Sequence, residues 1–241
     1  MDLKEIKIWN IKYNLLSMEE IVDIVSKWLS EGRRGIHLTG VNAETVAIAQ
    51  VDELLRNAIL DSDIVNVDSY LPTSFLRRKG YDVGRVPTPD VMERFFEVAN
   101  EKQQKVYFLG AKQEVLNLLK TVLEKEYPQM NVVGMRNGYY KEDDEEDIAS
   151  KISELSPDYL FIALPSPKKE IFIQKYKKML DVGVFYGIGG ALDAKAGVYK
   201  RPPKFLQGHG LEGVFRILRK PISHGKRIHW NYKFVKLALK N

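Results

Sequence analysis

The chain has 241 residues, of which 44% are hydrophobic and 29% charged, a composition typical of a folded protein rather than a disordered one. Its length suits one large α/β domain, or one domain plus an appendage. The lack of cysteine excludes disulfides, a thiolate nucleophile and a Cys-ligated metal, and it fits a reducing compartment. The charged first residues and the lack of a run of ~18 apolar residues predict neither a signal peptide nor a membrane span.

Charge is unevenly distributed along the chain. Twelve Lys and Arg residues and a single acid, Glu212, lie from Lys195 to the end, which gives this tail a charge of +11. Because the whole chain carries +5, residues 1–194 carry −6. An acidic body with a strongly basic tail indicates a negatively charged partner for the tail.

Apolar periodicity and helix-start signals predict an alternation of strands and helices. Ser17 and Glu20 form a capping box, and Thr88-Pro89-Asp90 is a strong helix start with Thr88 as the N-cap. The near-continuous apolar strands predict an α/β fold, with a mostly parallel Rossmann-like sheet covered by helices on both faces. Strands are expected within 3–13 and at 36–39, 64–67, 106–109, 131–135, 159–164 and 184–186, and helices at about 18–31, 43–50, 52–60, 73–79, 88–102, 113–126, from 141 onward and 167–180.

The strand at residues 64–67 stops abruptly at a carboxylate, Asp68. Open α/β sheets bind ligands at the carboxyl edge of their strands, where a partly desolvated carboxylate can take a proton. The alternative is that Asp68 caps the helix that follows it. Position alone leaves both interpretations open.

Other predicted strands also end in small or polar residues, and in a parallel sheet these ends lie on one side. Bare backbone there can approach a phosphate, and the next helix adds its N-terminal dipole, so a nucleotide or sugar nucleotide is the expected ligand. No GxGxxG or Walker A motif is present, which disfavours a dinucleotide or ATP site. No cluster has a convincing metal-ligand spacing, so we expect no metal and no cofactor. The residues concerned are Gly40, Asn42, Gly110, Ala111, residues 165–167 and residues 187–190.

The composition shifts near Gly197, which predicts an α/β domain over residues 1–196 and a basic C-terminal appendage over residues 197–241. In the appendage, aromatic residues such as Trp230 and Tyr232 alternate with Lys and Arg. This pattern suits an anionic bilayer surface or single-stranded nucleic acid. A helix pair packed on the body is a third interpretation.

A series of motifs, spread over nearly the whole chain, resembles the WecG/TagA/CpsF family of bacterial glycosyltransferases. In order they are Asn42-Ala43-Glu44, Asp68, Arg85-Val86-Pro87-Thr88-Pro89-Asp90-Val91-Met92, Gly134 with Asn137-Gly138-Tyr139-Tyr140, Pro165-Ser166-Pro167-Lys168-Lys169-Glu170, and Gly187-Ile188-Gly189-Gly190-Ala191-Leu192-Asp193 running into Gly197-Val198-Tyr199-Lys200-Arg201-Pro202-Pro203.

The resemblance implies an inverting, metal-independent hexosyltransferase of cell-wall or exopolysaccharide synthesis. The donor would be a UDP-sugar, often UDP-N-acetylmannosamine or its uronic acid, and the acceptor a polyprenyl-diphosphate-linked sugar. It also implies a cytoplasmic protein, peripheral on the inner face of the cell membrane, whose C-terminal appendage touches the membrane and helps to close the active site. The family's base falls on Asp68, and an Arg that contacts the diphosphate or acceptor falls on Arg85.

Three positions depart from the family pattern, and they bear on the donor sugar more than on the reaction class. Gly40 stands where the family usually has Thr, with Thr39 beside it. Lys169 replaces a Gln associated with substrate contact, and Ser69 replaces the usual Gly after the aspartate.

These observations predict that Asp68 deprotonates the acceptor hydroxyl while Arg85, backbone amides and tail arginines stabilise the leaving diphosphate. The alternative is a nucleotide- or RNA-binding module with a basic tail, although we expect no nucleic-acid partner for the transferase. A homo-oligomer is left open. The expected substrate-binding residues are Thr39, Gly40, Asn42, Gly110, Ala111, Lys169, Gly187, Gly189, Gly190, Arg216, Arg219 and Arg227.

Overall fold

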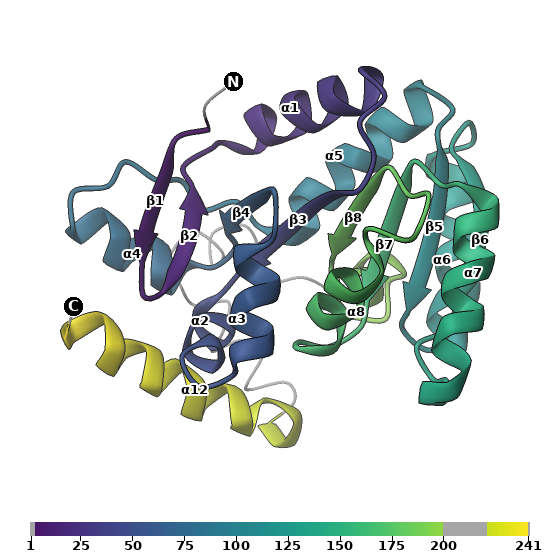
Figure 1. Ribbon diagram of the computed structural model, residues 1–241. Helices are drawn as coiled ribbons and strands as arrows, with labels where there is room; N and C mark the ends of the chain where they lie inside the picture. Colours follow the sequence, from purple (N-terminus) through teal and green to yellow (C-terminus); the bar gives the residue numbers. More distant parts are fainter. Residues whose placement is uncertain (1–2, 200–220, 241) are drawn as a thin grey trace.

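The computed structural model describes residues 3–199 and 221–240 and has one central sheet (Figure 1). Six strands pair in the order β4-β3-β8-β7-β5-β6, and every pair is parallel. A separate antiparallel hairpin precedes them. The strands are β1 (Glu5–Ile8), β2 (Ile11–Asn14), β3 (Ile36–Val41), β4 (Ile64–Val67), β5 (Lys105–Gly110), β6 (Asn131–Arg136), β7 (Tyr159–Ala163) and β8 (Val184–Gly187).

The helices alternate with the strands, as expected. They are α1 (Met18–Ser30), α2 (Ala43–Ala49), α3 (Glu53–Leu60), α4 (Tyr70–Arg78), α5 (Thr88–Glu101), α6 (Gln113–Glu126), the 3-10 turn η1 (Glu142–Asp144), α7 (Glu145–Leu155), α8 (Lys168–Tyr176), α9 (Ala191–Lys195) and α12 (Pro221–Lys240). The parallel sheet with flanking helices confirms the α/β prediction, and α12 is a C-terminal helix beyond it.

Both faces of the sheet are buried, because alternate strand residues point to opposite sides. On one face, Phe108, Phe161 and Tyr186 pack with apolar residues of α1, α5, α6 and α9. On the other face, α7 and α8 cover the half that contains β5 and β7, while α2, α3 and the hairpin cover the half that contains β3 and β4 (Figure 1).

A crevice forms between β3 and β8, which are neighbours in the sheet. The helix after β3, α2, packs on one face, and the helix after β8, α9, packs on the other. Neighbouring strands whose connections leave to opposite faces open a crevice at their carboxyl ends, where α/β proteins bind ligands. The topology therefore places a candidate site at this edge.

Local signals were largely correct, with three corrections at element ends. The capping box of Ser17 and Glu20 is present. Gly40 continues β3, which extends to Val41, instead of forming a turn. The N-cap of α5 is Pro87 rather than Thr88, and α8 ends at Tyr176, earlier than the expected residue 180.

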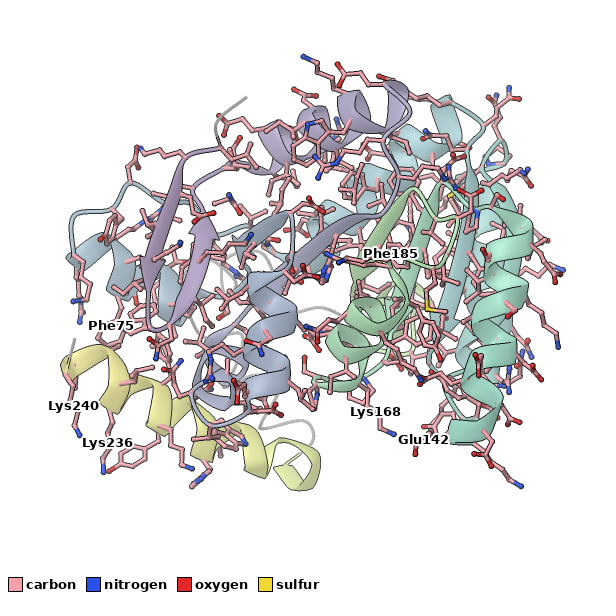
Figure 2. All side chains as sticks on the ribbon, viewed as in Figure 1. Phe75, Glu142, Lys168, Phe185, Lys236 and Lys240 are labelled. Atoms are coloured by element: carbon pink, nitrogen blue, oxygen red, sulfur yellow. The ribbon has the colours of Figure 1, made fainter. Side chains whose placement is uncertain are left out.

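The C-terminal helix α12 packs against the first half of the chain. Phe234 is fully buried, with its ring centroid 5.0 Å from that of Trp9 and 5.9 Å from that of Phe75, both edge-to-face. Such pairs stabilise by about 0.5–1.5 kcal/mol beyond the area they bury. Lys236 and Lys240 point from α12 away from the body (Figure 2). The boundary predicted at residue 196 stays a prediction.

Candidate functional site

A cavity of about 540 Å³ lies at the carboxyl edge of the sheet, at the crevice between β3 and β8. Its walls come from the ends of strands and the first turns of the helices that follow them, so several helix N-termini surround it. The charged side chains in the lining are Glu44, Asp68, Arg85 and Lys169. The lining residues are Gly40, Asn42–Thr45, Ile48, Asp68–Leu71, Arg85, Thr88, Pro89, Leu164–Ser166, Lys169, Gly187–Ala191, Tyr199 and Asn231.

Asp68 is half-buried in this cavity, directly after β4. Its Oδ1 accepts a hydrogen bond of 2.6 Å from the backbone N–H of Thr88, the first residue of α5. The next helix, α4, has Ser69 as its N-cap and no side-chain capping bond. The alternative that Asp68 caps the helix following it is therefore wrong: its carboxylate meets the N-terminus of a different helix, where negative charge is favoured.

Arg85 lies beside Asp68 in the cavity lining. Its Nε donates to the backbone carbonyl of Asp68 at 3.1 Å, which fixes the guanidinium to the end of β4. A guanidinium has five N–H donors in a planar fork suited to phosphate. The structure thus brings together the two residues predicted to be catalytic.

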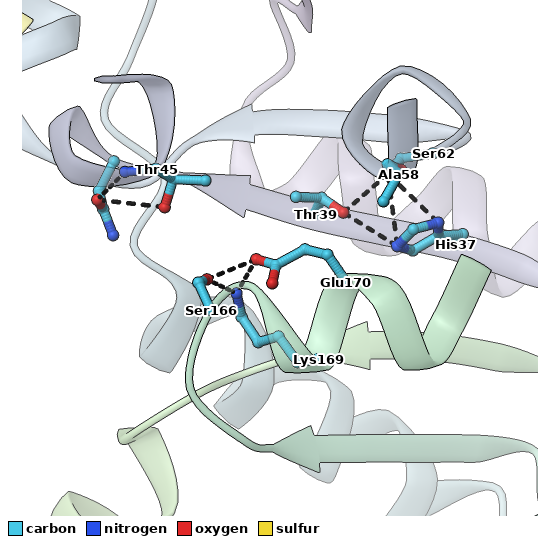
Figure 3. A network of polar contacts seen from close by, with 9 residues as sticks. His37, Thr39, Thr45, Ala58, Ser62, Ser166, Lys169 and Glu170 are labelled. Atoms are coloured by element: carbon cyan, nitrogen blue, oxygen red, sulfur yellow. Dashed lines mark hydrogen bonds and ion pairs between the residues drawn. The ribbon is translucent and has the colours of Figure 1, made fainter. Parts of the chain in front are cut away.

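Lys169 enters the cavity from the first turn of α8 and belongs to a buried polar trio (Figure 3). Its Nζ forms an ion pair with Glu170 and donates to Ser166 Oγ at 2.5 Å. The Ser166 hydroxyl donates to Glu170 Oε1 at 2.7 Å. The Lys169 ammonium is therefore held in place, and the carboxylate of its buried neighbour Glu170 balances its charge.

The strand-end residues on β3 and β8 also line the cavity. Asn42 caps α2, with its Oδ1 accepting from the Thr45 N–H at 3.0 Å. Gly187 lies under Lys169, because a Cβ there would come within 3.0 Å of Lys169 Cδ. Gly189 has a φ of +51°, a conformation that favours glycine. Gly40, Asn42, Gly187, Gly189 and Gly190 thus gather at one place, as predicted.

The structure does not bring three other predicted residues into this cavity. Thr39 is buried in β3, where its Oγ1 lies 2.8 Å from Ser62 Oγ and 3.1 Å from His37 Nε2 (Figure 3). Burial holds the pKa of His37 well below its usual value, so this imidazole is neutral. Gly110 ends β5 and Ala111 follows it; both lie outside the lining, and the backbone of Ala163 fills the space beside Gly110.

The tail arginines cannot be placed in the site. Arg216 and Arg219 lie outside the described residues, and of Arg227 only the backbone, within α12, is described. Two lining residues that sequence reasoning missed come from this end of the chain. Asn231 of α12 reaches the cavity, and Tyr199 donates from its hydroxyl to the Gly190 carbonyl at 3.0 Å. Tyr199 belongs to the motif at residues 197–203 that resembles the family, whereas nothing in the sequence around Asn231 indicated a place in the site.

In residues 3–199 and 221–240, no group of three or more His, Cys, Asp or Glu side chains is arranged to hold a metal ion. No helix of that same part of the chain combines the length and the apolar character needed to cross a membrane.

Comparisons with known proteins find one family and related enzymes. The model of the glycosyl transferase WecG/TagA/CpsF family matches residues 6–241. A relative from Bacillus subtilis (strain 168), N-acetylglucosaminyldiphosphoundecaprenol N-acetyl-beta-D-mannosaminyltransferase, is 27% identical over 215 residues, covering 89% of this chain and 83% of the relative. The protein of the same name from Bacillus spizizenii is 31% identical over 157 residues, covering 65% of this chain and 60% of the relative.

Proposed function

This chain belongs to the glycosyl transferase WecG/TagA/CpsF family and is a glycosyltransferase, and we propose that it transfers an N-acetylmannosaminyl or closely related hexosyl group from a UDP-sugar to a polyprenyl-diphosphate-linked sugar. The printed names of the relatives, mannosaminyltransferases acting on a diphosphoundecaprenol-linked sugar, support this donor group and acceptor class. The product enters the synthesis of a cell-wall polymer. The alternative of a nucleotide- or RNA-binding module has no comparable support.

The observation that carries the proposal is the pairing of Asp68 and Arg85 at the end of β4. A carboxylate and a guanidinium face one cavity, joined by the Arg85 Nε bond to the Asp68 carbonyl. Transfer to a hydroxyl needs an acceptor for the hydroxyl proton and a cation for the departing diphosphate. This pair supplies both.

In the proposed reaction, Asp68 takes the proton of an acceptor hydroxyl as its oxygen attacks the anomeric carbon of the donor. The bond from that carbon to the UDP oxygen breaks in the same displacement, so the configuration inverts. Charge builds on the diphosphate, which Arg85, Lys169 and the backbone amides at residues 187–190 stabilise. The reaction needs no metal or cofactor in this scheme.

The exposed side of α12 supports a place at the inner, cytoplasmic face of the membrane. Ile228, Tyr232 and Leu239 are 50%, 57% and 72% exposed, beside the exposed Lys233 and Lys236. Apolar side chains among lysines suit an anionic lipid surface. The same helix lends Asn231 to the cavity, so docking on lipid would bring the cavity to a lipid-linked acceptor.

The test is UDP release from a panel of UDP-sugars with a lipid-diphosphate-linked N-acetylglucosamine acceptor. We expect acceptor-dependent UDP release, and Asp68→Asn should cut turnover by ~10² or more, as for loss of a general base. Asp147→Asn, at an exposed position of α7, is the control and should behave as the parent. Undiminished turnover by Asp68→Asn, or UDP release that ignores the acceptor, would refute the proposal.

A further inference from the structure

Four hydrogen bonds join residues 66–68, at the end of β4, to residues 85–88, at the start of α5. We call these bonds the clasp. The side-chain amide of Asn66 donates to the Val86 carbonyl at 2.7 Å, and the Val86 N–H donates to the Val67 carbonyl at 2.8 Å. The other two are the bond from Arg85 Nε to the Asp68 carbonyl and the bond from the Thr88 N–H to Asp68 Oδ1. The clasp thus fixes the cavity's carboxylate and guanidinium to each other.

Asn66 is the one side chain of the clasp that stands outside the cavity lining. It is fully buried in a strand whose other residues, Ile64, Val65 and Val67, are all apolar. Its Oδ1 is buried and has no hydrogen-bond partner among the described residues. An unpartnered buried polar atom is destabilising, so packing alone favours an apolar side chain here. The hydrogen bond from the Asn66 amide to the Val86 carbonyl offsets part of this cost.

The neighbouring strand leaves room for the clasp at Gly40. A Cβ at this position would lie 2.4 Å from Thr88 Oγ1 and 3.5 Å from Asn66 Nδ2. Gly40 on β3 and Asn66 on β4 are paired in the parallel register. Asn66 therefore holds Val86, which leads into α5, while Gly40 leaves space for the side chain of Thr88, the first residue of α5.

We propose that Asn66 is a positioning residue for sugar transfer. Through Val86 it sets where Arg85 and the Thr88 N–H stand relative to the Asp68 carboxylate, while touching no substrate itself. The inference rests on the proposed function, in which Asp68 is the base. Misplacing reacting groups by about 1 Å can cost ~10² in rate, so loss of one clasp bond is expected to slow turnover.

The test compares Asn66→Ala with Asn14→Ala. Asn14 is also a buried asparagine bound to β4, since its Oδ1 accepts from the Val65 N–H at 2.8 Å, but its hydrogen bonds within the described residues do not reach residues 85–88. Both variants should lose thermal stability. Only Asn66→Ala should also lose kcat, by ~10-fold or more, with little change in the KM for the donor. Equal kcat in the two variants, measured below both melting temperatures, would overturn the proposal.

A second pair of variants perturbs the clasp without substituting Asn66, which keeps the proposal testable if Asn66→Ala does not fold. Gly40→Ala should push Thr88 away and lower kcat, and adding Thr88→Ala, which removes Oγ1 but keeps the N–H, should restore most of the loss. A double variant as slow as Gly40→Ala would count against the clasp. Failure of the proposed function is seen separately, as undiminished turnover by Asp68→Asn.

Discussion

Glycine ends a strand at two places on the carboxyl edge of the sheet: at one the space beside it is filled by backbone, and at the other it borders the cavity. At the end of β5, Gly110 is packed against backbone, because a Cβ there would lie 2.4 Å from the carbonyl carbon of Ala163. Gly138 closes the same spot, where a Cβ would be 3.1 Å from the Gly110 Cα. At the end of β8, the atoms nearest to a Cβ added at Gly187 belong to the flexible side chain of Lys169, and Gly190 lines the cavity. We call these places the closed end and the open end.

The comparison teaches that a glycine at a strand end signals close approach without identifying what approaches. At the closed end, the chain itself fills the space: the Ala111 N–H donates to the Ala163 carbonyl at 3.1 Å, and the Gly138 N–H donates to the Ala111 carbonyl at 3.0 Å. At the open end, the loops leave a space for a ligand. Substitutions should therefore change stability at one end and catalysis at the other.

The largest difference is expected at the cavity side, from Arg85→Ala. Removing the guanidinium should lower kcat/KM by ~10², or about 2.7 kcal/mol, because the departing diphosphate loses a fixed cation. Arg85→Lys should recover only part of this, since lysine lacks the Nε that binds the Asp68 carbonyl. Arg94→Ala, which removes a cation paired with Glu19 and Glu97, is the control for charge alone. If Arg85→Ala is as active as Arg94→Ala, the predicted difference between the cavity and the closed end is wrong.

At the closed end, Gly110→Ala should lower stability and leave catalysis unchanged. Its φ of +123° is a conformation reserved for glycine, and a methyl group would collide with the Ala163 backbone. We expect a loss of about 2 kcal/mol in the free energy of unfolding, measured by denaturant titration. The KM for the donor should stay as in the parent. A raised KM without loss of stability would mean that this end also binds substrate.

Gly187→Ala should have a smaller effect, and on binding. The new methyl group would press on the methylene groups of Lys169 at 3.0–3.3 Å, which can yield by a few tenths of an ångström. We expect the KM for the donor to rise about fivefold, close to 1 kcal/mol, with the melting temperature nearly unchanged. Steady-state UDP release measures the KM, and thermal melts measure the stability. A loss of stability as large as that of Gly110→Ala would contradict this prediction.

The smallest effect is expected from Tyr199→Phe. This change removes the hydroxyl that donates to the Gly190 carbonyl and leaves the ring. A single half-exposed hydrogen bond contributes about 0.5–1.5 kcal/mol, so the donor KM should rise by roughly twofold to tenfold at most, and we expect the lower end. An unchanged KM for the donor would mean that the Tyr199 hydroxyl does not contribute to donor binding at the open end.

The fold could be predicted from the sequence because its signals are local. Continuous apolar runs gave the six parallel strands, and the capping box of Ser17 and Glu20 gave the start of α1. Where a neighbour distant in the sequence intervenes, the local signal was wrong. Thr88 looked like an N-cap, but its N–H is bound by Asp68, twenty residues earlier in the chain, and Pro87 is the cap.

The site could be predicted only in part, since facing direction and loop closure are not local. Residues 39 and 40 are adjacent, yet alternation sends Thr39 into a buried polar cluster and puts Gly40 at the cavity. Gly110 and Gly187 carry the same signal, and only the tertiary fold separates them. Asn66 could have been noticed as an amide inside an apolar strand, whereas its partner Val86 could not.

The contact between α12 and the β1–β2 hairpin has a consequence for biosynthesis. Trp9 leaves the ribosome well before Phe234, the ring it packs against, and before Asn231, which lines the cavity. A nascent chain can assemble the sheet and still lack a finished site. The cavity wall is therefore complete only when these two distant segments have met, a contact that is slow to form because of its long sequence separation.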